Sequence, residues 1–243
     1  MKSFKSPSAI TSLCIVSGIL SLLFFTGCKK LAGLPLQQNA EHETTVIDPH
    51  INESAWAFLK ERALGTSSYK DSIFYLMYLA VLYSGIDTAE YTKINRTFIF
   101  LHKDAINRKS GNITTPDCYF GKYKVDSPPV PAKDWGKYPK EKVKNYLLSL
   151  IVEGDHTFEN ISTDAEFDQT LMPLNSDSLN PQSLISFRVT NDRDSKIRIN
   201  DFPGSDFPAP GLTTPGLQVR TGGILATNGT IHVVDRVVFF QRH

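Results

Sequence analysis

His232 and Asp235 carry the side-chain types that general acid–base catalysis uses, an imidazole and a carboxylate. They stand three residues apart in a segment whose apolar residues alternate as in a strand, so the two side chains would point to opposite faces. They cannot form a direct dyad. Asp235 would share its face with apolar neighbours, where a carboxylate must accept hydrogen bonds or pair with a cation. We expect both residues to hold the fold rather than to catalyse a reaction.

The remaining histidines and the most oxygen-rich loop do not indicate a metal site. His102, His156 and His243 have no metal-ligand spacing with a cysteine or a carboxylate. Residues 191–195, Asn-Asp-Arg-Asp-Ser, resemble part of a calcium loop but lack its later Gly and bidentate Glu, which favours a solvated hairpin turn. The chain also has no Gly-x-Ser-x-Gly elbow and no Gly-rich phosphate loop. We expect no metal and no cofactor, and a hydrolase would need an acidic pair or triad that only the fold could assemble.

An aromatic and proline-rich insertion at about residues 110–139 is the candidate binding segment. Its prolines block regular structure, and its aromatic content argues against disorder. Exposed Tyr and Trp side chains can stack on sugar faces or anchor a protein interface. The ligand-binding candidates are Tyr119, Tyr123, Trp135 and Tyr138. The alternative is that the insertion folds back as a lid on the hydrophobic core, and the exposure of these side chains distinguishes the two.

The start of the chain is typical of a bacterial secretory signal. Two lysines stand in the first five residues, and residues 9–25 are apolar apart from Ser, Thr and Gly. The run ends in Phe-Thr-Gly followed by Cys28, which resembles a lipobox, where the cysteine is acylated and becomes the first residue of the mature protein. The alternative is an uncleaved signal anchor with an incidental cysteine. We expect a signal peptide over residues 1–27 and lipidation of Cys28, because two acyl chains supply stable anchoring.

Residues 28–50 have little apolar periodicity and indicate a tether. Lys29 and Lys30 follow the cysteine, at the place where Asp signals retention at an inner membrane, so we expect anchoring in the outer membrane of a Gram-negative bacterium. Because Cys14 would leave with the signal and Cys28 would carry lipid, Cys118 has no partner for an internal disulfide.

Length and composition predict one globular domain over residues 51–243. The chain has 243 residues, of which 41% are hydrophobic and 21% charged, and this is ordinary globular usage. Such a length buries a core without disulfides. The 26 Lys and Arg balance 25 Asp and Glu, so the chain lacks the basic excess that phosphate neutralisation requires. We therefore expect no nucleic-acid partner.

The first half of the domain is predicted to be mainly helical. Apolar spacing and a following Gly predict helices over residues 52–64 and 71–84, the second apolar nearly all round and hence buried. Residues 97–101 form a short apolar run suited to a buried strand, and a brief helical turn is expected over 103–109. A third helix is expected over residues 140–150.

The second half is predicted to be β-structure. Four short alternating runs, separated by Asn, Asp, Ser and Pro, cover residues 156–161, 167–172, 184–190 and 196–200. Two longer runs, 217–227 and 230–240, are joined by Asn228-Gly229. This dipeptide predicts a hairpin with a type I′ turn, in which both central residues need φ > 0.

The closing segment resembles the C-terminal motif of fasciclin-type domains. Those domains carry Ala-(Ser/Thr)-Asn-Gly followed by apolar-His-apolar-apolar-Asp-(Lys/Arg), and residues 226–236 provide Asn228, Gly229, His232 and Asp235 at the matching places. An opening helix, the run 97–100, Asp-Ala-Ile at 104–106 and residues 143–154 follow the family's order. The resemblance implies an α+β fold, a compact domain with N-terminal helices packed on a β-sandwich-like wedge and a C-terminal β-hairpin.

The chain also departs from the family pattern. Leu101-His102-Lys103 replaces the Pro-(Thr/Ser)-(Asp/Asn) that follows the family's first strand, and Ser149-Leu150 replaces its Tyr-His. Gly223-Ile224 stands where animal matrix members carry the Asp-Ile pair that is associated with integrin binding. The integrin-type determinants are absent, so a matrix-receptor function is not expected.

Signal and resemblance together predict a lipid-anchored, non-enzymatic envelope protein that mediates adhesion or assembly. Its expected partners are a membrane, through the lipid on Cys28, and other envelope proteins or glycans. The alternative is a glycan- or small-ligand-binding accessory lipoprotein of a surface nutrient-uptake system, which would use the aromatic residues of the insertion.

Overall fold

The structure is a computed structural model whose described residues all lie within one compact unit, 48–243. It describes residues 48–66, 68, 70–201, 212–213, 216–238 and 241–242. The expected signal peptide, Cys28 and most of the tether lie outside the described residues, as does His243. The described fold begins within the expected tether: Leu225 N–H donates to the carbonyl of Pro49, and Ile51 N–H donates to that of Leu225.

Two helices begin the domain, each ended by a glycine as the sequence predicts. Helix α2 (Ala55–Leu64) starts where the Ser54 hydroxyl accepts the N–H of Ala57, and it ends at Gly65 with φ of 68°. Helix α3 (Tyr75–Ser84) ends at Gly85 with φ of 67°. It begins four residues later than expected, and Asp71, its expected start, forms an ion pair with Arg62 of α2 instead. The expectation that α3 is buried all round is wrong at Tyr75 and Leu82, which are exposed.

The remaining helix and four short helical turns lie in the middle of the chain. Helix α6 (Lys140–Leu148) stops two residues before its expected end, because the chain turns at Ser149 and enters a strand at Ile151. The short elements are η1 (Thr88–Tyr91), α4 (Lys103–Ile106), α5 (Tyr119–Lys122) and η2 (Trp135–Lys137). Within the described part of the chain, no helix is both long and apolar enough to cross a bilayer.

The central sheet joins the two ends of the domain. Its strand order is β10 (Thr221–Ala226), β11 (Gly229–Val234), β1 (Arg96–Leu101) and β4 (Ile151–Glu153). Strands β1 and β11 pair in parallel, from Arg96 opposite Gly229 to Leu101 opposite Val234, and the other pairs are antiparallel. The expected buried strand over 97–101 and the expected C-terminal hairpin are both confirmed.

A second sheet is antiparallel throughout, in the order β5 (Glu166–Gln169), β6 (Leu184–Val189), β7 (Ile197–Ile199) and β9 (Leu217–Gln218). The strand expected over residues 156–161 is wrong, because this segment forms a turn closed by the Asn160 side chain, which accepts the N–H of Thr157. Two-stranded ladders join β2 (Lys109–Ser110) to β3 (Ile113–Thr114) and β8 (Leu212–Thr213) to β12 (Gln241–Arg242).

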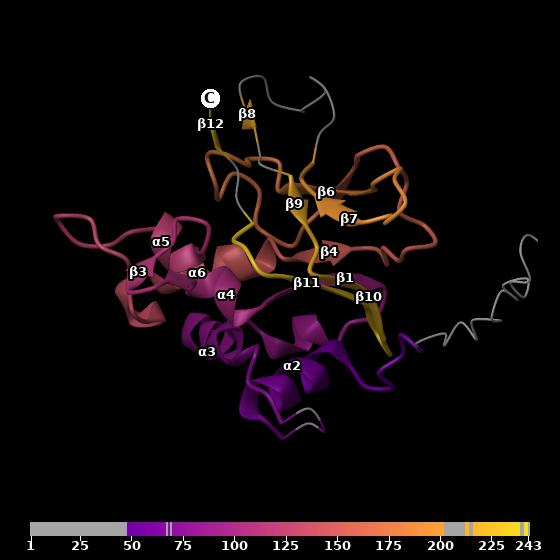
Figure 1. Ribbon diagram of the computed structural model, residues 1–243, viewed down its shortest axis with the longest axis horizontal. Coiled ribbons are helices and arrows are strands. Elements are labelled where there is room, and N and C mark those ends of the chain that lie inside the picture. Colours follow the sequence, from indigo (N-terminus) through magenta and orange to yellow (C-terminus); the bar gives the residue numbers. More distant parts are fainter. Residues whose placement is uncertain are drawn as a thin grey trace, which may run out of the picture. The chain divides into compact units, whose positions relative to one another are not determined.

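The central sheet separates the helices from the second sheet (Figure 1). Phe100 of β1 packs on Phe58 of α2 and on Phe74 at the start of α3. His232 of β11 packs on Phe187 of β6, with ring centroids 5.7 Å apart. Because adjacent strand residues face opposite sides, the paired strands β1 and β11 contribute side chains to the helix side and to the second-sheet side of the central sheet. The domain is therefore a mixed α+β fold with N-terminal helices, two sheets and a C-terminal hairpin, and the expected fold class is confirmed.

Candidate functional site

Asn228 connects three separate backbone segments. Its side chain is 6% exposed. Its Oδ1 accepts the N–H of Ala55 at 2.8 Å, and its Nδ2 donates to the carbonyls of Tyr91 at 3.1 Å and Lys93 at 3.0 Å. The hairpin tip thereby holds the first turn of α2 and the end of η1. We call this arrangement the Asn228 knot.

The turn at the hairpin tip is not the expected type I′ turn. Ala226 pairs with Gly229, so Thr227 and Asn228 are the loop residues, and neither has a positive φ. The reason lies in the Asn228 side chain, whose three backbone partners fix its position. Gly229 serves another purpose, because a Cβ there would lie 1.9 Å from the carbonyl oxygen of Arg96, at φ of 150°. It permits the close approach of β11 to β1.

His232 is fully buried, and both of its ring nitrogens have backbone partners. Its Nδ1 accepts the N–H of Gly223 at 3.1 Å, and its Nε2 donates to the carbonyl of His156 at 2.9 Å. Burial lowers the pKa of the imidazole to about 4. The ring is therefore neutral at pH 7 and has no free nitrogen for proton transfer.

Asp235 lies beyond the end of β11 rather than on a strand face among apolar residues, because the strand stops at Val234. Its carboxylate pairs with Arg108 at 2.9 Å and with Arg220 at 3.7 Å. Arg108 also donates to the backbone carbonyl of Asp235 and pairs with Asp117 at 3.2 Å. As expected for this carboxylate, its partners are cations, but the network is only partly buried.

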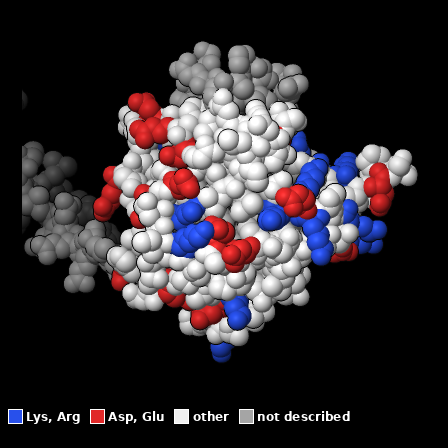
Figure 2. All heavy atoms as spheres, turned by 180° about the vertical axis from the view of Figure 1, so that it is seen from behind, with Lys and Arg blue, Asp and Glu red and all other residues white. Residues whose placement is uncertain are grey.

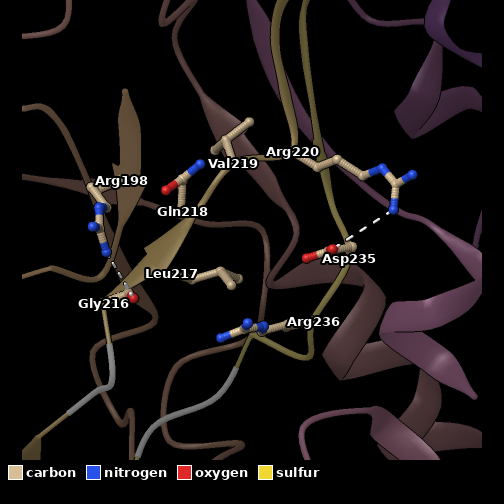
Figure 3. Close-up of a pocket in the computed structure, with 8 residues that line it drawn as sticks. All are labelled: Arg198, Gly216, Leu217, Gln218, Val219, Arg220, Asp235 and Arg236. Carbon is tan, nitrogen blue, oxygen red and sulfur yellow. Dashed lines mark hydrogen bonds and ion pairs between the residues drawn. The ribbon is translucent and has the colours of Figure 1, made fainter. Parts of the chain in front are cut away.

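A polar pocket of about 360 Å³ lies beside this network (Figure 3). Arg198, Arg220 and Arg236 line it, and each has a partner. The guanidinium of Arg220 turns toward Asp235, Arg198 points to the carbonyl of Gly216 at 3.5 Å, and Arg236 pairs with Asp117 at 3.7 Å. Asp235 and Asp117, the partners of Arg220 and Arg236, also pair with Arg108, so these carboxylates only partly offset the positive charge of the pocket lining.

The aromatic side chains of the insertion form a buried cluster. Tyr119, Phe120, Trp135 and Tyr138 are 1%, 0%, 4% and 5% exposed, and Tyr123 is partly buried. With Tyr146 of α6, whose ring centroid lies 4.7 Å from that of Tyr119, the four buried residues form the insertion cluster. The exposed platform expected of the four candidates is therefore not present, and the insertion is a lid on the core.

Hydrogen bonds to backbone carbonyls hold this lid in place. The indole N–H of Trp135 donates to Leu76 of α3 at 2.8 Å, and the hydroxyl of Tyr138 donates to Tyr123 at 2.7 Å. The hydroxyl of Tyr83 donates to the carbonyl of Tyr138 at 2.7 Å. These bonds fix a segment that has little regular structure of its own.

A second pocket, of about 510 Å³, lies against the edge of the lid. We call it the tyrosine pocket. Tyr119 and Tyr123 line it from the insertion, and Lys142, Asn145, Tyr146 and Ser149 line it from α6 and the residue after this helix. The far side is formed by Met172 and residues 176–179. Only the two tyrosines were among the sequence candidates, although the spacing 142, 145, 146 and 149 places four polar side chains on one helix face and could have indicated the site.

Lysines are frequent around this pocket but few of them line it. Residues 122–144 contain seven Lys against three Asp and Glu. Figure 2 shows basic side chains gathered on the side where Figure 1 draws α5 and α6. The charged residues that line the pocket are Lys142 and Asp177, whose charges offset each other. Lys142 lies 5.1 Å from the ring centroid of Tyr123.

The other titratable side chains are dispersed over the described residues. His102 pairs with Asp104 at 3.2 Å, and His156 pairs with Asp168 at 3.5 Å. Burial is the largest cause that lowers the pKa of His102 and raises that of Asp168. No group of three His, Cys, Asp or Glu side chains that could hold a metal occurs in this part of the chain. Cys118 is a free, buried thiol that contacts the carbonyl of Thr115.

No protein-family model and no curated protein matches the chain. Among solved structures, the chain is similar to a FAS1 domain pair from the insect cell adhesion molecule fasciclin I. The TM-score is 0.38, and the identity is 13% over 76% of this chain and 45% of that chain. The chain thus spans about half the length of this solved structure. At this TM-score, the likeness assigns neither a residue role nor an activity to this chain.

Proposed function

We propose that this chain is a lipid-anchored, non-enzymatic module of a bacterial cell envelope, whose fasciclin-type domain mediates adhesion or assembly. The Asn228 knot is the observation that carries the proposal. The motif residues through which the sequence resembles fasciclin-type domains use their polar groups to join the hairpin, the first helix and the central sheet. A motif of this kind builds a scaffold whose outer surface is left for contacts with partners.

The contacts of the motif residues also argue against catalysis by them. A general base needs a free nitrogen or oxygen within reach of a substrate proton and a pKa near the working pH. His232 has neither, because both ring nitrogens are bonded and the pKa is about 4. Asp235 is held by Arg108 and Arg220. We therefore assign structural roles to His232 and Asp235.

The anchor can be tested separately from the domain. Wild-type, Cys28→Ala and Cys14→Ala chains are produced in a Gram-negative host and labelled with palmitate. Cys14 is the matched control, since it also lies near the start of the chain but leaves with the signal. We expect label and membrane fractionation for the wild type and Cys14→Ala, and an unlabelled precursor for Cys28→Ala. A mature, labelled Cys28→Ala chain contradicts lipid anchoring at this cysteine.

Assembly is tested by crosslinking in intact cells that produce the full-length chain. We expect a defined crosslinked species that contains another envelope component and that is lost when Cys28→Ala prevents anchoring. Purified chain is also incubated with esterase, glycosidase and peptidase substrates. Turnover that a single substitution abolishes would overturn the non-enzymatic proposal.

The alternative of a glycan-binding accessory protein cannot rely on all four aromatic candidates. Trp135 and Tyr138 belong to the lid, where they are buried and cannot present a face to a sugar. Of the four aromatic candidates, Tyr119 and Tyr123 still line an open volume, the tyrosine pocket.

A further inference from the structure

Three arginine side chains line the polar pocket beside Asp235, and they come from different parts of the fold (Figure 3). Arg198 belongs to β7, Arg220 precedes β10, and Arg236 follows β11. We call the pocket lined by these residues, Asp235 and residues 216–219 the arginine pocket. Among the described residues that line it, Asp235 is the one carboxylate, so the lining carries three positive charges and one negative charge. An excess of cations around one concave site favours an anionic ligand.

Arg198 has no carboxylate partner among the described residues. It stands directly opposite Arg188 in the ladder of β6 and β7, where like charges destabilise a sheet. The carboxylate of Asp201, which lies against Gly216, pairs with Arg188 and neutralises it. Arg198 donates only to the carbonyl of Gly216, at 3.5 Å, which is long for a hydrogen bond. Its charge is therefore not offset, and an anion beside it would stabilise this part of the sheet.

Arg236 is paired only at long range and remains accessible. Its side chain is 59% exposed, and its Nε lies 3.7 Å from Asp117. Asp117 forms a shorter pair with Arg108, at 3.2 Å. In Figure 3 the guanidinium of Arg236 extends below Leu217 toward the side on which Arg198 lies. The terminal nitrogens of Arg236 are thus available to a ligand that also contacts Arg198.

Arg220 lies on the other side of the pocket, where its guanidinium turns toward Asp235 (Figure 3). The side chain is 48% exposed, and its pairs with Asp104 and Asp235 are 3.6 and 3.7 Å long. Asp235 pairs more closely with Arg108, at 2.9 Å. The carboxylates around the pocket are therefore shared among more arginines than they can neutralise. These groups are Asp104, Asp117 and Asp235 with Arg108, Arg198, Arg220 and Arg236.

The donors of this lining match a phosphate group. A guanidinium presents parallel N–H groups that fit two oxygens of a phosphate, and two positive charges in excess match a phosphate dianion. Gln218 stands directly opposite Arg198 in the ladder of β7 and β9, so its side-chain amide adds a donor on the same face. The volume of about 360 Å³ is that of a small-molecule site and leaves room for a small group attached to the phosphate.

We propose that the arginine pocket binds a phosphate group, either free or as a monoester of a small molecule. Arg198 and Arg236 are its principal binding residues, and Arg220 and Gln218 are further donors. The inference goes beyond the proposed envelope function and does not depend on it. A module that assembles with other envelope components can also bind phosphate, so failure of either proposal leaves the other standing.

The test is isothermal titration of the purified full-length chain in a phosphate-free buffer of low ionic strength with a maltoside detergent. The probes are inorganic phosphate, glycerol 3-phosphate and, as a singly charged control, acetate. The variants Arg198→Gln and Arg236→Gln each remove one guanidinium from the pocket. Arg193→Gln is the matched control, because it removes the same charge from a side chain that is 98% exposed and does not line the pocket.

We expect at least one phosphate probe to bind more tightly than acetate, and each pocket variant to weaken its affinity by about tenfold or more, because hydrogen bonds to charged groups are strong. Arg193→Gln should bind as the wild type does. Binding of inorganic phosphate alone identifies the free ion as the ligand, binding of glycerol 3-phosphate alone identifies a monoester, and binding of both identifies the phosphate group itself.

Three results would overturn the proposal: neither phosphate probe binds, acetate binds as tightly as they do, or the pocket variants bind as Arg193→Gln does. Thermal unfolding shows whether each variant is folded. Because the side chain of Arg236 is largely exposed, its replacement should leave the domain folded. Arg236→Gln therefore decides the test by itself if Arg198→Gln does not fold.

Discussion

Two aromatic clusters stabilise this domain by different means. The helix-side cluster, between α2, α3 and β1, consists of Phe58, Phe74, Tyr91, Phe98 and Phe100. The insertion cluster consists of Tyr119, Phe120, Trp135, Tyr138 and Tyr146. Four of the five rings in the first carry no polar atom, whereas four of the five in the second do.

The difference follows from the backbone around each cluster. Helices and strands satisfy their own N–H and C=O groups, so the helix-side rings need only pack. The insertion has short turns and two-residue strands, so its side chains bond to backbone carbonyls instead, as Trp135 does to Leu76 and Tyr138 to Tyr123. We therefore expect the first cluster to unfold with the whole domain and the second to open locally.

The largest expected effect comes from the Asn228 knot, which holds the backbone beneath the helix-side cluster. Asn228→Ala removes three hydrogen bonds and leaves the N–H of Ala55 and the carbonyls of Tyr91 and Lys93 without this partner. We expect the free energy of unfolding to fall by about 3–4 kcal/mol, measured by urea denaturation.

The matched control for this substitution is Asn191→Ala, because Asn191 is exposed in the turn between β6 and β7. It should change stability by less than about 0.5 kcal/mol. If the two variants are equally stable, the Asn228 knot does not stabilise the fold, and the backbone beneath the helix-side cluster does not depend on it.

Acid should weaken the central sheet through His232. The folded-state pKa of about 4 lies below the ordinary histidine pKa of 6.5, so protons bind the unfolded state more readily. Stability should be full above about pH 6.5 and should fall as the pH is lowered toward 4, by about 3 kcal/mol in all. Urea denaturation at pH 7.5 and 5 measures the effect. A His232→Gln chain should be less stable than the wild type at pH 7.5 and should lose less stability between pH 7.5 and 5. If both chains lose the same stability, groups other than His232 cause the effect.

A smaller effect is expected at the lid. Trp135→Phe keeps a ring but removes the bond to the carbonyl of Leu76, which should cost about 2 kcal/mol. Trp56→Phe is the control, since Trp56 is partly buried and its indole has no hydrogen bond among the described residues. Hydrogen exchange should quicken in the insertion of the Trp135 variant but not in β1. Equal acceleration in β1 would mean that the lid and the sheet open together.

Much of the scaffold was predictable because its signals are local. Helix α2 has a Ser cap and a Gly stop within one short segment, and β1 is a short apolar run. The Asn-Gly dipeptide predicted the hairpin. The turn type was not predictable, because the partners of Asn228 lie 135 to 173 residues away in sequence and local rules do not include them.

The candidate site was less predictable for a related reason. Sequence composition indicated that the insertion is ordered and aromatic, but burial depends on where it packs. Trp135 is buried because Leu76, 59 residues earlier, offers a carbonyl to its indole. Asn145 was overlooked because a polar residue on a helix is usually exposed to solvent. Here residues of the insertion and of the segment 172–179 line the same pocket as Asn145.

The smallest expected effect compares one hydroxyl in each cluster. Tyr91 and Tyr119 both bury a hydroxyl without a partner among the described residues, whereas the hydroxyl of Tyr138 donates to Tyr123. Tyr91→Phe and Tyr119→Phe should each leave stability unchanged or raise it by up to about 1 kcal/mol, and Tyr138→Phe should lower it by about 1 kcal/mol. Thermal unfolding measures all three. If Tyr138→Phe is as stable as Tyr119→Phe, the hydrogen bond from Tyr138 to the carbonyl of Tyr123 does not stabilise the lid.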